Sequence, residues 1–99
     1  MAKIRILREG NLTGVYELPE RGGTTVSRSS GAEITMPQRE VSVPHCIIIP
    51  RNGTYKVVDL ASTNGTYVRN EKITEARDLN NGDAIQLGRS DTLLIFLEE

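Results

Sequence analysis

Residues 46–58 read CIIIPRNGTYKVV, and this stretch decides the fold of the 99-residue chain. The apolar run 46–49 and the segment 55–58, which is apolar except for Lys56, flank the pair Asn52-Gly53. An Asn-Gly pair between such runs favours a type I′ turn, because both central residues of that turn need positive φ angles. The stretch therefore predicts a β-hairpin. Its first strand is continuously apolar, so we expect it to be central in a sheet and covered on both faces.

The rest of the chain repeats this pattern of short extended segments between turn residues. No window shows sustained apolar residues at helical spacing. The pairs Asn64-Gly65 and Asn81-Gly82 predict further turns, and 37–40 is expected to be a loop. Strands are predicted at 3–8, 15–18, 24–28, 34–36, 66–68, 84–87 and 92–97 in addition to the hairpin. About ten short strands favour an all-β sandwich, a single domain over residues 1–99.

The composition restricts the kind of partner. Twelve basic and thirteen acidic residues give a net charge of −1, so no overall positive field attracts nucleic acid or an anionic membrane. One cysteine and one histidine form no internal disulfide and no recognisable zinc-ligand set. The first five residues alternate charged with aliphatic side chains, unlike a signal peptide or membrane anchor. We expect a cytoplasmic monomer without metal or cofactor.

Catalysis is not expected from these residues. The chain has no evident pair of acid and base, no nucleophile with a partner, and no glycine-rich phosphate loop leading into a helix. We interpret His45 as structural, hydrogen-bonded in place beside Ser42. Cys46, inside an apolar run, is assigned to the core. Asp83 follows a turn, where a short polar side chain usually hydrogen-bonds nearby backbone.

Four sequence blocks have the order and spacing of one known family. They are Ser27-Arg28, Ser42-Val43-Pro44-His45, the ten residues 59–68 (DLASTNGTYV) and the eight residues 81–88 (NGDAIQLG). With Glu33-Ile34 between the first two blocks, the chain resembles the forkhead-associated (FHA) domain over nearly its whole length. The resemblance implies an eleven-stranded, mostly antiparallel β-sandwich whose loops at one end bind an extended phosphothreonine peptide.

The resemblance also assigns roles to individual residues. Arg28 would bind the phosphate, because a guanidinium has planar donors that match phosphate oxygens. Ser42 would add its hydroxyl, and Ser42 and Val43 their backbone N–H groups. Thr63 would bind the phosphate or line its pocket, while Asn64 would hydrogen-bond the peptide backbone. Phosphothreonine would be preferred to phosphoserine. His45 and Gly65 are expected to support the site structurally. Arg69 is expected to contact the peptide.

Three departures from the family pattern affect the expected site. Ser27 replaces the glycine that usually precedes the arginine, which predicts a small shift of that arginine. Val43-Pro44 stands where polar or basic residues are common, and proline has no N–H to donate. Lower affinity is therefore expected. Arg69-Asn70 replaces a frequent Asn-Gly pair, which predicts a change of turn type.

Several charged residues have an ordinary interpretation when taken alone. Arg28 is then an exposed side chain weakly paired with Glu33. Arg89 lies in the closing loop, where we do not expect a binding role. Arg39 and Glu40 precede Ser42 and lie near the expected peptide path, where mixed charge selects among flanking residues.

Two functions remain open at this stage. The first is a signalling adaptor that binds a phosphothreonine protein after a Ser/Thr kinase has acted. The second is a phospho-independent FHA scaffold in a larger assembly, which Val43-Pro44 favours. An enzyme or a nucleic-acid binder ranks below both.

Overall fold

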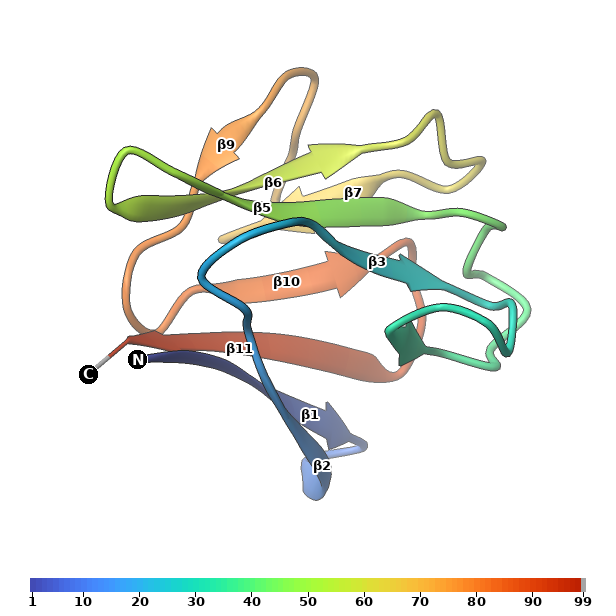
Figure 1. The fold of residues 1–99 in the computed structure, drawn as a ribbon. Helices are drawn as coiled ribbons and strands as arrows, with labels where there is room; N and C mark the ends of the chain where they lie inside the picture. Colours follow the sequence, from blue (N-terminus) through green and yellow to red (C-terminus); the bar gives the residue numbers. More distant parts are fainter. Residues whose placement is uncertain (99) are drawn as a thin grey trace.

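In the computed structural model, which describes residues 1–98, eleven strands form two facing sheets (Figure 1). The strands are β1 (Ala2–Arg8), β2 (Asn11–Glu17), β3 (Thr24–Ser27), β4 (Ile34–Thr35), β5 (Cys46–Arg51), β6 (Thr54–Asp59), β7 (Thr66–Val68), β8 (Glu71–Lys72), β9 (Arg77–Asp78), β10 (Ala84–Leu87) and β11 (Thr92–Glu98). One sheet has the order β2-β1-β11-β10-β7-β8 and the other β4-β3-β5-β6-β9. All pairings are antiparallel except β3 with β4. The described residues contain no helix that could span a membrane.

The hairpin of β5 and β6 forms at the predicted place. Asn52 and Gly53 have φ angles of 52° and 79°, both positive as a type I′ turn requires. The central position of β5 is confirmed, since it lies between β3 and β6. Coverage on both faces is not seen, because Ile47 and Ile49 are only half-buried. The strand also continues through Pro50, which pairs with a residue of β6.

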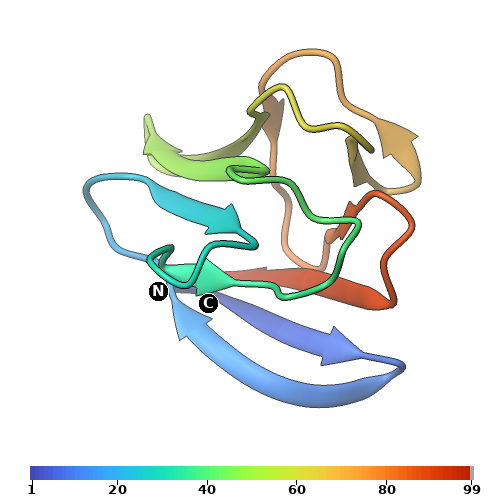
Figure 2. The same cartoon turned by 90° about the vertical axis from the view of Figure 1, so that its right-hand side faces the viewer.

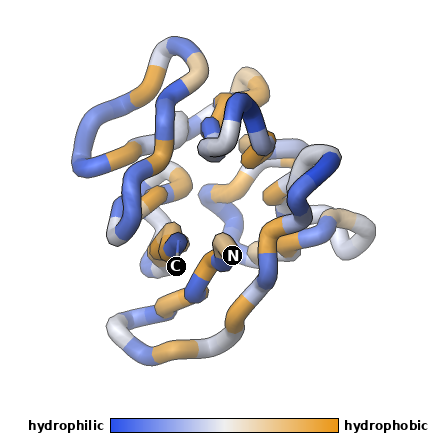
Figure 3. The backbone as a smooth tube through the Cα atoms, turned by 60° about the vertical axis from the view of Figure 1, so that its left-hand side comes forward, coloured by the Kyte–Doolittle hydropathy of each residue, from blue (hydrophilic) through white to orange (hydrophobic). Residues whose placement is uncertain are grey.

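The core lies between the sheets and takes one side chain in two from each central strand. Phe96 of β11, Ile85 of β10 and Val57 of β6 have no exposed surface. Burying each such side chain stabilises the fold by about 1.5–3 kcal/mol. Tyr55 packs on Phe96 with ring centroids 5.7 Å apart. Figure 3 shows the hydropathy of the residues along the chain, with hydrophobic segments separated by hydrophilic ones.

Two strands were not predicted, and one turn differs from the prediction. The two-residue strands β8 and β9 are too short to show alternation. The expected change of turn type after β7 is wrong, because Arg69 and Asn70 have φ angles of 51° and 66°. Both are positive, as in the type I′ turn that an Asn-Gly pair would form.

The loops that position the predicted site gather at one end of the sandwich. They are the β3–β4, β4–β5, β6–β7 and β10–β11 connections, at the right of Figure 1 and facing the viewer in Figure 2. The hairpin turn between β5 and β6, the start of β1 and the end of β11 lie at the other end (Figure 1). Residues far apart in the sequence therefore meet at a single rim.

Candidate functional site

The β4–β5 loop holds Arg28 through main-chain carbonyls. Arg28 Nε donates a hydrogen bond to Val41 O at 2.9 Å, and Arg28 N donates to Ser42 O at 3.2 Å. The two Nη groups of this exposed residue have no hydrogen bond or ion pair within residues 1–98. The weak pair with Glu33 is not formed, because Glu33 Oε1 accepts a hydrogen bond from Thr25 N at 2.7 Å. Arg28 is thus anchored by Nε and open at its tip.

The β6–β7 loop binds the same segment from the other side. Thr63 N donates to Ser42 Oγ at 3.0 Å, and Asn64 Nδ2 donates to Glu40 O at 3.0 Å. Thr63 and Asn64 are both exposed. The structure therefore brings Arg28, Ser42, Thr63 and Asn64 together around residues 40–42.

His45 connects the two loops from beneath. Its side chain is fully buried. Ser42 N donates to Nδ1 at 2.9 Å, so that nitrogen must accept. Nε2 lies 2.9 Å from Gly65 O, which can only accept, so Nε2 carries the proton. A neutral imidazole with this tautomer fixes the Ser42 loop to the Asn64-Gly65 turn.

Asp59 organises the β6–β7 loop from its start. Its carboxylate accepts hydrogen bonds from Ser62 N at 3.1 Å and from Thr66 Oγ1 at 2.7 Å, as well as from Ser62 Oγ. Burial alone raises the pKa of the Asp59 carboxyl, but the hydrogen bonds from Ser62 and Thr66 outweigh burial. The net pKa lies below the ordinary value of 3.8. The Asp59 carboxylate thus holds the loop that carries Thr63 and Asn64 in place through hydrogen bonds.

Acid should weaken the fold through Asp59. A carboxyl whose pKa is lowered by folding contributes stability above its unfolded pKa and loses it as the pH falls through its folded value. We expect Asp59→Asn to lower the free energy of unfolding by a constant amount above about pH 4. Below that pH the difference from the wild type shrinks. Urea unfolding measured from neutral pH to about pH 2.5 checks this, and a difference that stays constant throughout would contradict it.

Gly88, at the end of β10, allows the closest approach in the site. Its φ is +62°, and a Cβ atom there would lie 2.7 Å from the Cβ of Asn64 and 3.5 Å from Glu40 O. Gly88 N also donates to Gly65 O at 2.8 Å. The β10–β11 loop, including the exposed Arg89, therefore lies beside Asn64, nearer the site than the sequence led us to expect.

Arg69 lies away from this cluster. The hydrogen bond from Arg69 N to Ala84 O (3.3 Å) and that from Gly88 N to Gly65 O (2.8 Å) flank the paired strands β7 and β10 at opposite ends. The three residues of β7 span about 10 Å. The expected peptide contact of Arg69 stays a prediction, for an exposed residue outside the cluster. Its Nη1 instead pairs with Asp83.

Asp83 takes the local role that the sequence predicted and adds one that it did not. Its Oδ2 accepts a hydrogen bond from Asn80 N at 2.7 Å, which closes the turn before β10. The same oxygen pairs with Arg69. A salt bridge to a residue from another hairpin leaves no trace in local sequence.

Val43 lies at the exposed tip of the β4–β5 loop. The residue keeps 56% of its surface exposed, and the peptide bond between it and Pro44 is cis. No hydrogen bond of the Val43 backbone N–H occurs within the described part of the chain. The structure thus places an apolar side chain and a free donor beside Ser42.

Cys46 is buried in the core, as predicted. Burial raises the pKa of its thiol to about 12, with a smaller contribution from the Asp59 carboxylate. A buried neutral thiol is a poor nucleophile. We expect no reaction of Cys46 with a maleimide in native buffer and complete reaction in concentrated urea, measured by mass spectrometry. Rapid labelling of the folded protein would contradict the burial.

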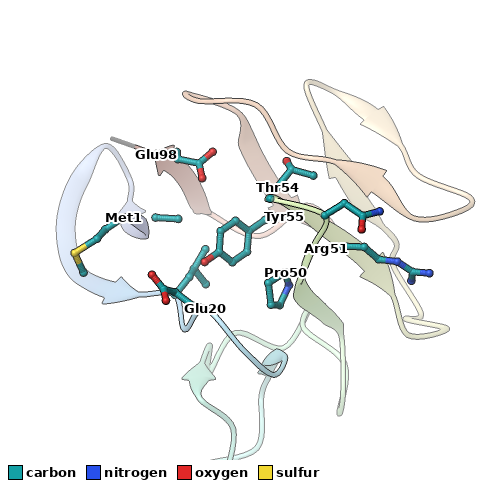
Figure 4. Close-up of a pocket in the computed structure, with 11 residues that line it drawn as sticks. Met1, Glu20, Pro50, Arg51, Thr54, Tyr55 and Glu98 are labelled. Carbon is teal, nitrogen blue, oxygen red and sulfur yellow. The ribbon is translucent and has the colours of Figure 1, made fainter.

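A cavity of about 400 Å³ lies at the opposite end of the sandwich. Tyr55 stands in its wall, with Glu20 and Glu98 near the ring and Arg51 on another side (Figure 4). The Tyr55 hydroxyl donates to Pro19 O at 3.0 Å. None of the predicted site residues lines this cavity, so it is separate from the cluster around residues 40–42.

Two sheets of short strands, with four connecting loops gathered at one rim, define this chain as a β-sandwich module. The family model for the FHA domain matches residues 23–88, two thirds of the chain. The chain belongs to the FHA domain family.

Relatives and solved structures agree with this assignment. The chain is 32% identical over 97 residues to the oxoglutarate dehydrogenase inhibitor of Corynebacterium diphtheriae, covering 98% of this chain and 66% of that protein. It is 33% identical to the glycogen accumulation regulator GarA of Mycolicibacterium smegmatis, covering 93% and 56%. The chain thus spans less than two thirds of the length of these relatives. A structure from a study of phosphothreonine-dependent FHA domain interactions superposes with a TM-score of 0.83 at 27% identity, covering 98% and 97%.

Proposed function

We propose that the chain is a phosphothreonine-peptide-binding module that joins its protein to a partner after a Ser/Thr kinase has modified that partner. The observation that carries the proposal is the open guanidinium tip of Arg28 beside Ser42, Thr63 and Asn64. Support comes from family membership and from the phosphothreonine dependence named for a similar structure.

The donors around Arg28 suit a phosphate dianion. A phosphorylated side chain has close to two negative charges and three strong acceptor oxygens. Arg28 offers two free Nη groups for charge-assisted hydrogen bonds. Because Ser42 Oγ accepts from Thr63 N, its own proton remains available to a phosphate oxygen. The Thr63 hydroxyl and the Val43 N–H are further donors at the same rim.

Asn64 is placed to read the peptide backbone. One Nδ2 proton is used by Glu40 O, which leaves the second Nδ2 proton and Oδ1. An amide side chain with one donor and one acceptor free can pair with a peptide N–H and C=O together. Asn64 then orients the peptide and Arg28 supplies the charge.

The phospho-independent scaffold is the second candidate. Val43 presents an exposed apolar surface where a further phosphate donor would be expected, and Pro44 has no N–H. A partner that packs on this tip would need no phosphate. In either function the module acts without catalysis, in keeping with the inhibitor and regulator names of its relatives. We place it in the cytoplasm, where the unpaired Cys46 remains reduced.

A peptide titration tests the proposal. Degenerate peptide libraries with a fixed phosphothreonine, phosphoserine or unmodified threonine are titrated into the protein. Binding is measured by fluorescence. We expect binding of the phosphothreonine library, weaker binding of the phosphoserine library and none of the unmodified one. Equal binding of all three libraries would favour the scaffold.

A further inference from the structure

Two β-turns with an arginine at the centre of each lie at the edge of the Arg28 site. The turn at 38–41 is closed by an N–H···O=C hydrogen bond of 3.1 Å between its last and first residues, and Arg39 is central. The turn at 87–90 is closed in the same way at 3.3 Å, and Arg89 is central. Both arginines are exposed.

Contacts hold these turns next to each other. Gly88 in the second turn packs against Glu40 O in the first, at 3.5 Å from a Cβ built on the glycine. Gln38 Nε2 donates to Thr92 Oγ1 at 3.1 Å, just beyond the second turn. Asn64 contacts both Glu40 and Gly88. The two turns therefore form one continuous rim with the residue proposed to orient the peptide.

The charges of this rim are unbalanced. Neither Arg39 nor Arg89 makes a hydrogen bond or ion pair with any other residue from 1 to 98. The neighbouring Asp91 forms an ion pair with Arg8, with 3.2 Å between Asp91 Oδ2 and Arg8 Nε. Glu40 is the opposing charge on the same turn, and it is exposed and unpaired within the described chain. Two free cations against one carboxylate leave the rim net positive.

We propose that Arg39 and Arg89 form a second anion subsite, which selects phosphothreonine peptides that carry another carboxylate or phosphate. This inference rests on the phosphothreonine function proposed above. Arg28 binds the phosphothreonine, and the subsite binds a second anionic group of the same peptide. Attraction to two guanidinium groups raises affinity and falls as salt screens it.

The spacing of the two anions follows from chain geometry. Consecutive Cα atoms are about 3.8 Å apart, so Arg39 starts within roughly 7 Å of Val41, whose carbonyl holds Arg28. The arginine side chains add several ångströms of reach. An extended peptide advances about 3.3 Å per residue. The second anion therefore falls about two to four residues from the phosphothreonine.

The test uses fluorescence-polarisation titrations of a phosphothreonine peptide with alanine flanks. Glutamate, and separately a second phosphothreonine, is placed at each of about four positions on either side. The measured quantity is the affinity ratio of each charged peptide to the neutral one. We expect the best glutamate peptide to bind the wild type about fivefold more tightly than the neutral peptide. A second phosphate should give a larger ratio if the source of the anion is another modification.

Substitutions test whether Arg39 and Arg89 cause the affinity ratio between charged and neutral peptides. In Arg39→Gln with Arg89→Gln the ratio should fall to about one, and in Glu40→Gln it should rise. Arg51→Gln, which removes the same charge at the opposite end of the sandwich, should keep the wild-type ratio. An undiminished ratio in the double variant, or no preference for any acidic peptide, overturns the subsite.

The same titrations keep the subsite distinct from the phosphothreonine function. If the neutral phosphothreonine peptide binds and Arg28→Ala abolishes that binding, the function stands whatever the ratio shows. If no phosphothreonine peptide binds the wild type, both proposals fail.

Discussion

Arg28→Ala should reduce the affinity for a phosphothreonine peptide by roughly 100-fold or more and leave the fold intact. The Nη groups that would meet the phosphate are free of other partners in the described chain, so the substitution removes charge without breaking an ion pair. Truncating one side of a hydrogen-bonded charge pair costs about 2–5 kcal/mol. The loss to stability is limited to one hydrogen bond to Val41 O, about 1 kcal/mol. Isothermal titration calorimetry and thermal unfolding measure the two quantities.

Arg28→Lys is the matched control for charge. A lysine ammonium keeps the positive charge but cannot hold Val41 O and present a planar pair of donors together. We expect an affinity between those of the wild type and Arg28→Ala, about tenfold below the wild type. If Arg28→Ala binds phosphothreonine peptide as tightly as the wild type, the phosphate does not bind at this rim.

His45→Ala should be among the most destabilising single substitutions. It creates a cavity at a fully buried position and leaves Ser42 N and Gly65 O without their partner. The cavity and the orphaned polar groups together cost about 3 kcal/mol. In a domain of this size that lowers the melting temperature by roughly 12–20 °C. Well below this temperature, phosphopeptide affinity should also fall, because His45 ties the Ser42 loop to the Asn64-Gly65 turn.

Thr24→Val is the matched control for burial. Thr24 is as fully buried as His45, but its hydroxyl has no hydrogen-bond partner within residues 1–98. Replacing an unsatisfied buried hydroxyl with a methyl group should leave stability unchanged or raise it by about 1 kcal/mol. Equal destabilisation by the two substitutions would mean that the hydrogen bonds of His45 do not matter. Differential scanning fluorimetry of both variants decides this.

Much of the fold was predictable because its signals are local. The strands at 66–68 and 84–87 match β7 and β10 residue for residue. Their bounds are set by turn residues that need positive φ, such as Gly65 and Gly88. The strands β8 and β9 were not predicted, because a strand of two residues is too short to show an alternation of apolar and polar residues. The apolar run of the first hairpin strand ends at residue 49, but pairing with β6 keeps Pro50 within β5.

The candidate site was only partly predictable from the sequence. The sequence motifs and their spacing predicted Arg28, Ser42, Thr63 and Asn64 as site residues. The structure places these four residues together. The groups that anchor them are mainly backbone carbonyls, at residues 40–42, and any residue type supplies a carbonyl. Asp59 could have been found from its place three residues before Ser62, as a carboxylate that accepts from its own turn.

Arg69 and Arg89 show what position along a chain does not reveal. Arg69 lies close in sequence to Asn64, yet β7 carries it to the opposite end of the sheet. Arg89 is far from Asn64 in sequence, yet Gly88 touches Asn64 directly. The strand order, with β10 beside β7, decides both placements.

The central claim is that phosphothreonine peptides bind at the rim around residues 40–42. Two-dimensional ¹H–¹⁵N spectra of the labelled protein, recorded during titration with a phosphothreonine peptide, test it most directly. We predict that the largest amide shifts fall on Arg28, Ser42, Val43, Thr63 and Asn64, and that the unmodified peptide moves none of them. Shifts confined to the Asn52-Gly53 hairpin and the Tyr55 cavity, or equal shifts with the unmodified peptide, would contradict the account.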